Sequence, residues 1–312
     1  MYELIELQRA IANNRFTLPV VGVFCVLIWL FLSHDSDMTP VLGGLAISLC
    51  AVYLIAELNN RNSLLRNGSR LLSTFAFIIL TIIPALHPLS TGLFLMLFYV
   101  NSYFFLFQTT RIKSPLLTFL IYVTLSIASL LFPKLLYVVP TYWIAQLYMK
   151  SFSQKCFVAS ILGIIVPYWI AFAIYLYLDD YTWLMRMIDE MASNSVPDYS
   201  AITLQQFVQF IYLVCLLAVG IVDFYKNNTK DKARVRFIYT VVIFQSLFLV
   251  LFILWLPQHF YTLMPLLVVD SAIIGGHFYA LTYTKYSAIA SVIFVIFTVA
   301  VFLLPYLPAI NI

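Results

Sequence analysis

Long apolar runs, separated by short polar segments, occupy most of the chain between residues 16 and 305. A bilayer core of about 30 Å is crossed by about 20 helical residues, and eleven runs reach or approach that length. They are residues 16–33, 39–57, 70–87, 91–109, 115–132, 135–149, 157–178, 206–225, 237–256, 260–281 and 287–305. The pattern predicts an all-α fold, a polytopic transmembrane helix bundle of about eleven spans that forms a single domain over residues 1–312. The sixth run is short and contains Pro140, so it either crosses fully or forms a re-entrant hairpin with the fifth run.

Two polar segments carry apolar residues at helical spacing. In segment 1–15 these are Leu4, Leu7 and Ile11, which predicts an amphipathic N-terminal segment on the cytoplasmic side. Loop 179–205 has the same pattern, and we expect a short helix there on the outer membrane surface. Its apolar face comprises Leu184, Met187, Ile188 and Met191. This helix serves either as a structural lid or as a gate or platform for a lipid substrate.

The distribution of basic residues predicts the orientation of the chain. Cytoplasmic loops of membrane proteins carry an excess of Lys and Arg. With a cytoplasmic N-terminus, only Lys134 and Arg186 of the 17 basic residues fall on the outer side. We therefore predict a multi-pass protein of the bacterial inner membrane, with its N-terminus inside and its C-terminus outside.

Composition excludes the other broad classes. Hydrophobic residues make up 63% of the chain and charged residues 10%, against about 45–50% and about 25% in soluble domains. The continuous apolar runs also differ from the alternating pattern of transmembrane β-barrels. The 4 cysteines fall within spans or at their cytoplasmic ends, so no disulfide framework is expected.

Two stretches give the chain a family resemblance. They are residues 57–72, ELNNRNSLLRNGSRLL, and residues 131–180, which end in LYLDD. In these stretches and in its hydrophobic layout, the chain resembles an uncharacterised family of polytopic inner-membrane proteins of Bacteroidota. The resemblance implies a source and a compartment but no reaction.

The strongest candidate for chemistry is Asp270, at the centre of run 260–281. An ionisable group at membrane depth costs about 2.5 to 3.5 kcal/mol on insertion scales, so it is a candidate functional residue. His277 lies seven residues further, on the same helical face. Small residues, which let a neighbouring helix approach closely, are Ser271, Ala272, Gly275 and Gly276. We expect Asp270 to face the interior of the bundle.

Asn101 and Gln245 are the candidate partners of Asp270 at matching depth. Two interpretations stay open. Asp270 is either a neutral group that holds helices together by hydrogen bonds, or a proton or cation site in a transport path. In the second case the protein is transporter-like, with a polar site formed by Asp270, His277, Gln245 and Asn101.

The outer acidic residues suggest a different function. Multispan glycosyltransferases that use polyprenyl-phosphate sugars carry an outward catalytic acid soon after the first span, and this chain is similar in that respect. Their first outer loop is long, whereas here it is the short turn HDSDM. The candidate acids are Asp35, Asp37, Asp179 and Asp180. The alternatives to transport are therefore an enzyme acting on polyprenyl-linked envelope glycans, or a membrane scaffold.

A cytoplasmic loop offers candidate ligands for lipid headgroups, because basic residues at the inner interface attract anionic lipids. These are Arg61, Arg66 and Arg70. Metal binding is not expected, since the histidines show no close ligand spacing. We expect no cofactor, no nucleic acid, membrane lipids as partners, and a lipid-linked or small-molecule substrate. We expect a monomer or a small homo-oligomer.

Overall fold

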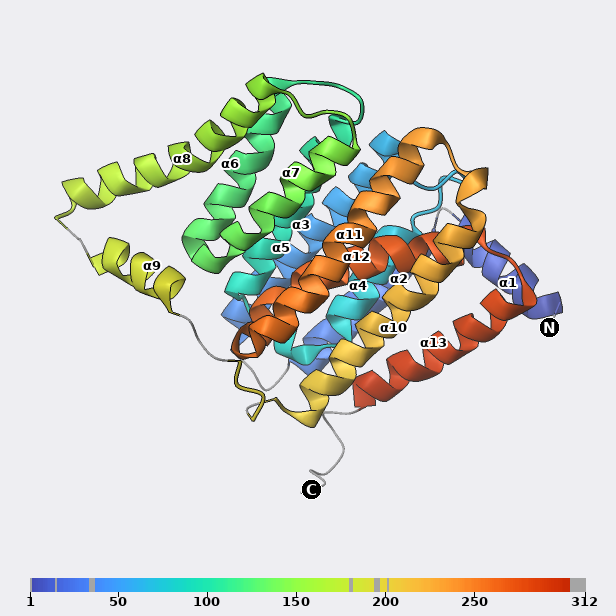
Figure 1. The fold of residues 1–312 in the computed structure, drawn as a ribbon. Coiled ribbons are helices and arrows are strands. Elements are labelled where there is room, and N and C mark those ends of the chain that lie inside the picture. The colour runs from blue at the N-terminus through green and yellow to red at the C-terminus, as the bar shows by residue number, and fades with distance from the viewer. Residues whose placement is uncertain are drawn as a thin grey trace.

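The computed structural model describes residues 2–14, 16–33, 37–179, 182–193, 197–200 and 202–303. Within these ranges the chain forms α-helices and short 3₁₀ turns, and no strand (Figure 1). Six of the helices are long and apolar enough to cross a membrane: α3, α5, α8, α10, α11 and α12. The predicted all-α fold is thereby confirmed and these helices suggest a membrane protein, while the count of eleven spans and the orientation stay predictions.

The helices follow the hydrophobic pattern, since each of the eleven apolar runs overlaps one of them. In chain order the elements are α1 (Tyr2–Asn13), α2 (Thr17–Leu32), α3 (Met38–Asn62), α4 (Leu71–Thr81), η1 (Pro84–Leu86), α5 (Thr91–Gln108), α6 (Pro115–Leu131), η2 (Pro133–Val138), α7 (Val139–Tyr148), α8 (Gln154–Tyr177), α9 (Thr182–Ala192), α10 (Leu204–Asn227), η3 (Asn228–Lys230), α11 (Ala233–Trp255), η4 (Pro257–His259), α12 (Phe260–Leu281) and α13 (Lys285–Leu303). Helices α1 and α9 lie in the two amphipathic segments.

Two helices are shorter than the runs that contain them. At a rise of about 1.5 Å per residue, the 11 residues of α4 and the 10 residues of α7 cover only about half of a bilayer core. Helix α4 ends before Pro84, because a residue that precedes proline is disfavoured in the α conformation, and Ile83 has φ −113° and ψ 89°. Helix α7 follows the 3₁₀ turn η2, which starts at Pro133.

Helix α12 is the centre of the bundle. Its most apolar stretch is entirely buried, against 28% for that of α8, which lies at the edge of the molecule (Figure 1). Helices α4, α5, α10 and α11 pack around α12. Small residues permit this packing, because a Cβ atom at Gly220 of α10 would lie 2.9 Å from the carbonyl oxygen of Ile274. A Cβ atom at Gly276 would lie 3.0 Å from the Cα atom of Leu72 in α4.

The C-terminal end of α12 also contacts the N-terminal helix. Gln8 of α1 is buried, and its side-chain amide donates a hydrogen bond to the carbonyl oxygen of Tyr279 over 3.0 Å. Helix α13 completes this edge of the bundle beside α1 and α10. The polar end of α12 therefore lies among segments that are far apart in the sequence.

Candidate functional site

The carboxyl group of Asp270 lies in the middle of α12 and is completely buried. The Tyr99 hydroxyl donates a hydrogen bond to its Oδ2 atom over 3.0 Å. The Tyr103 hydroxyl donates to its Oδ1 atom over 2.9 Å. The two tyrosines are one turn apart on α5 and so project from the same face of that helix. Each carboxyl oxygen therefore has its own hydroxyl partner.

A second layer of hydroxyl groups surrounds these tyrosines. The hydroxyls of Tyr99 and Tyr103 contact each other. Behind them, the Ser102 hydroxyl is hydrogen-bonded to the Tyr142 hydroxyl of α7. Tyr142 is fully buried, and its ring stacks on that of Tyr103 with a centroid separation of 6.3 Å. The surroundings of Asp270 are thus neutral hydroxyl groups from α5 and α7.

The partners of Asp270 differ from those that the sequence suggested. Asn101 is two residues from both Tyr99 and Tyr103, so it projects about 200° away from the face that contacts Asp270, and it is half-buried. The structure therefore separates Asn101 from the carboxyl group. The signal for the actual partners is the pair of tyrosines four residues apart in one apolar run.

Gln245 is fully buried on α11 and bonds to a different helix from the one expected. The Thr141 hydroxyl of α7 donates to its Oε1 atom over 2.6 Å, whereas its Nε2 atom has no hydrogen-bond partner within the described residues. The rings of Tyr239 and His277 lie 4.4 Å apart and fix the register of the antiparallel helices α11 and α12. Six residues further along α11, Gln245 lies opposite Ser271. It is therefore level with Asp270, although it bonds to Thr141.

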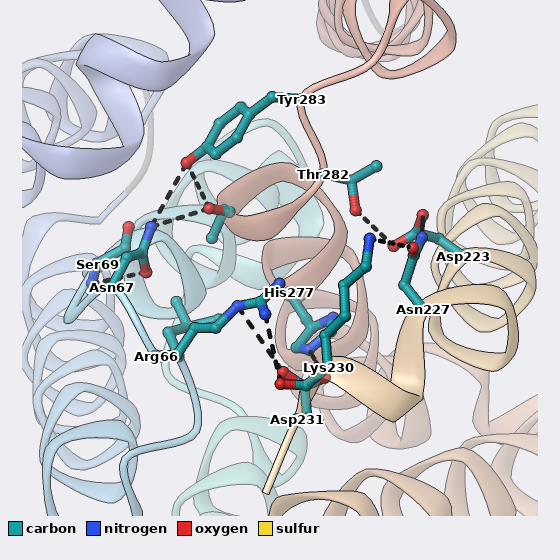
Figure 2. Close-up of polar contacts among 12 residues, drawn as sticks. Arg66, Asn67, Ser69, Asp223, Asn227, Lys230, Asp231, His277, Thr282 and Tyr283 are labelled. Atoms are coloured by element: carbon teal, nitrogen blue, oxygen red, sulfur yellow. Dashed lines mark hydrogen bonds and ion pairs between the residues drawn. The ribbon is translucent and has the colours of Figure 1, made fainter.

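His277 belongs to a separate cluster at the C-terminal end of α12 (Figure 2). Its Nε2 atom lies 3.1 Å from Oδ2 of Asp231, in the connection between α10 and α11, and both side chains are at most 5% exposed. The Nε atom of Arg66 lies 4.0 Å from Oδ1 of the same carboxylate. Seven residues of helix place His277 about 10 Å from Asp270 along the axis. The shared helical face of Asp270 and His277 can be read from the sequence, whereas Asp231 lies in a polar loop where acids are common and gives no such signal.

Further hydrogen bonds hold this cluster together (Figure 2). The Thr282 hydroxyl donates to Asp223 over 2.7 Å, and the Asn227 amide donates to the other oxygen of that carboxylate over 2.8 Å. On the opposite side, the Asn67 amide donates to the carbonyl oxygen of Ala280 over 2.9 Å. The end of α12 is thus fixed by the 59–69 segment on one side and by α10 on the other.

The asparagines of the 59–69 segment have a structural role. The Asn59 amide donates to the carbonyl oxygen of Ser69 over 2.7 Å, and its Oδ1 atom accepts from the Leu65 backbone over 3.0 Å. Asn62 accepts a hydrogen bond from Arg234 over 3.0 Å. These side chains replace the backbone partners that an irregular loop lacks. The segment is consequently an ordered wall beside the end of α12.

This wall and the start of α11 enclose a cavity of about 510 Å³, which we call the basic pocket. Arg66, Lys230 and Lys232 line it together with Asp231. Arg61 lies elsewhere, since it pairs with Glu57 over 2.6 Å and covers the ring of Phe104. Arg70 is the residue that precedes α4. Of the three arginines proposed for lipid headgroups, only Arg66 lines this pocket.

The outer acidic residues show no comparable arrangement within the described chain. Asp37 is exposed and immediately precedes α3, and Asp179 is exposed at the end of α8 with φ 53°. Asp35 and Asp180 lie outside the described residues. In the part of the chain that the structure describes, no three His, Cys, Asp or Glu side chains come together to hold a metal ion.

The chain belongs to a family of unknown function, DUF6427, whose sequence model matches residues 1–310. The predicted resemblance to an uncharacterised family is thereby confirmed. No curated protein and no solved structure matches the chain. Family membership carries no activity, so the functional argument rests on the two clusters along α12.

Proposed function

We propose that the protein is a transporter-like membrane protein in which the Asp270 carboxyl group binds and releases a proton within the bilayer. The observation that carries the proposal is a fully buried carboxyl group at the centre of the innermost helix, bonded to two hydroxyl groups. Helices α4, α5, α7 and α12 contain no Lys or Arg, so no cation from these helices neutralises the carboxylate. A carboxyl group in this setting is neutral at rest and ionises at a cost.

The tyrosine pair supports proton exchange at this carboxyl group. A tyrosine hydroxyl can both donate and accept a hydrogen bond. When Asp270 is ionised, Tyr99 and Tyr103 each donate to one of its oxygens. When Asp270 is protonated, it donates to one hydroxyl, which turns its own hydrogen toward the other tyrosine. Asp270 therefore keeps a hydrogen bond to each tyrosine in both protonation states, whereas the contact between the two hydroxyls is a hydrogen bond only in the protonated state.

A polar route toward the C-terminal end of α12 supports the transport interpretation. Two buried polar atoms on α11, Tyr239 Oη and Gln245 Nε2, have no hydrogen-bond partner within the described residues. By helix register Tyr239 lies level with His277, and Gln245 lies level with Asp270. Buried polar atoms of this kind are bonding sites for internal water. In our proposal protons reach Asp270 from the cytoplasm by way of Asp231, His277 and these two atoms.

The proposal also covers the number of membrane crossings, their direction and the membrane in which the protein lies. We infer eleven crossings of a bacterial inner membrane, with α4 and α7 crossing together with their 3₁₀ turns, η1 and η2. The end of α3, the end of α10, the start of α11 and the end of α12 meet in one cluster (Figure 2), as this alternation requires. This cluster holds Arg66, Lys230 and Arg234, which supports its placement on the cytoplasmic side. The outward C-terminus and the Bacteroidota source are part of the proposal as well.

Infrared difference spectroscopy on the full-length protein in nanodiscs tests the role of Asp270. We expect a protonated-carboxyl band that changes with pH in the wild type and is missing in Asp270→Asn. Asp37→Asn, at an exposed position, is the matched control and should retain the band. If the band assigned to Asp270 does not change over the pH range in which the protein is folded, Asp270 only holds helices together. The transport proposal would then be wrong.

A further inference from the structure

We propose that the basic pocket binds a phosphate-bearing ligand through Arg66 and Lys232. This inference is independent of proton exchange at Asp270. The pocket has a volume of about 510 Å³, within the range of small-molecule sites, about 300 to 1,000 Å³. These two basic residues come from segments that are distant in the sequence, and the segments are joined because Arg66 contacts the backbone of Lys230 although 164 residues separate them.

Arg66 is positioned to act as the principal anion-binding group. Its Nη1 atom donates to the carbonyl oxygen of Lys230 over 3.4 Å, and its Nε atom lies 4.0 Å from Asp231. A guanidinium has five N–H donors, more than these two contacts use. The side chain remains 45% exposed, so a ligand can reach it. Arginine held in this way favours paired hydrogen bonds to phosphate oxygens.

The charge balance of the pocket favours an anion. Asp231 is the only acidic residue that lines it among the described residues, and its carboxylate is 5% exposed and already shared by His277 and Arg66. The Lys230 ammonium points away from the ligand space, because it is bonded over 2.9 Å to the Oδ1 atom of Asn227, which does not line the pocket (Figure 2). Lys232 is exposed at the start of α11. The lining thus presents the cations of Arg66 and Lys232 to a ligand, whereas its single carboxylate is occupied.

The usual excess of basic residues in cytoplasmic loops does not explain why these basic residues meet around a cavity. The rule that basic residues favour the cytoplasmic side concerns their number in each loop, not their meeting around a cavity. Arg61 illustrates the difference, because it lies in the same segment but pairs with Glu57 and faces away from the pocket. Exposed Asn60 and Ser63 add neutral hydrogen-bonding groups to the lining. They suit the polar remainder of a phosphorylated ligand.

The phosphate group has two sources at a membrane surface, an anionic lipid headgroup and a soluble phosphorylated compound. Isothermal titration of the full-length protein in a neutral detergent separates them. The probes are dioctanoyl phosphatidylglycerol for the lipid and glycerol phosphate for the soluble compound. Saturable binding of both assigns the pocket to a soluble phosphate compound, and binding of the lipid alone assigns it to a headgroup. Both outcomes support the proposal.

Substitutions test whether the probe binds in the basic pocket. Arg66→Gln combined with Lys232→Gln should weaken binding of the probe at least about tenfold, since each removes a charge-assisted hydrogen bond. Lys232→Gln, at an exposed position where folding is not at risk, should weaken it by a smaller factor. The matched control Arg61→Gln should leave the affinity unchanged. The proposal is overturned if neither probe binds saturably, or if Arg61→Gln weakens binding as much as the pocket variants do.

Discussion

Two acidic groups, one on α12 itself and one against its C-terminal end, are held by different chemistry. Asp270, at the middle of the helix, is bonded to the neutral hydroxyls of Tyr99 and Tyr103. Asp231, at its C-terminal end, is bonded to His277 and lies near Arg66. Their depth in the bundle explains the difference, because a charged partner is costly to bury in the middle of an apolar bundle. Within two turns, one helix passes from hydroxyl partners to ionisable ones.

The largest effect is expected from a change that disturbs both groups by displacing α12. Gly220→Ala adds a Cβ atom 2.6 Å from the Ile274 side chain and 2.9 Å from its carbonyl oxygen. We expect a loss of about 3 kcal/mol in stability, because overpacking a tight contact costs about 1 to 3 kcal/mol. A thermal-shift measurement in detergent checks it. Gly22→Ala is the control, since the nearest atom to its added Cβ lies 4.0 Å away. Equal melting points for the two variants would contradict the packing argument.

A smaller effect should follow from removing the hydroxyl partners of Asp270. Tyr99→Phe and Tyr103→Phe each leave one hydroxyl, which can still bond to the carboxyl group. The double variant removes both and should cost about 2 kcal/mol, more than the sum of the single changes. Denaturation of the three variants in the same detergent measures this non-additivity. Additive losses would show that another group bonds to Asp270.

Sequence reasoning could select Asp270 but not its partners, and the reason is physical. An acid at the centre of an apolar run is rare, whereas this chain contains 21 tyrosines, which in a membrane bundle serve many packing roles. Hydropathy likewise located the helical segments but not the early end of α4, although Pro84 inside run 70–87 was a signal for it. Asp231 could not be selected, because only the folded chain brings its loop against His277.

Salt dependence should distinguish the two acidic groups more finely. Asp231→Asn removes a charge that faces His277 and Arg66, and we expect a loss of about 1 kcal/mol. Asp270→Asn keeps a group that can donate and accept between two hydroxyls, so it should be close to neutral for stability. High salt should reduce the part of the Asp231→Asn loss that comes from Arg66, whose side chain is 45% exposed, since screening weakens the interactions of accessible charges. Melting curves at low and high salt check this. An equal salt response in both variants would contradict the assignment of neutral partners to Asp270.

The smallest effect is expected at Arg61, which lies outside both clusters. Its pair with Glu57 is an exposed contact between residues four apart on α3. Such pairs contribute about 0.3 to 0.5 kcal/mol, so Arg61→Gln should change the melting point only slightly. The same thermal-shift assay measures the melting point of this variant. A loss comparable to that of Asp231→Asn would mean that the charge at Arg61 has a further partner.

The central position of α12 has a consequence for the order of assembly. The helices that surround it, α4, α5, α10 and α11, all precede it in the chain. During synthesis they must enter the membrane before the helix on which they pack exists. A nascent chain that ends before residue 260 therefore has an unfilled centre, where the hydroxyls of Tyr99 and Tyr103 lack the Asp270 carboxyl group. The final arrangement of α4, α5, α10 and α11 therefore requires α12 between them, and we expect chains truncated before α12 to be recognised and degraded as incomplete.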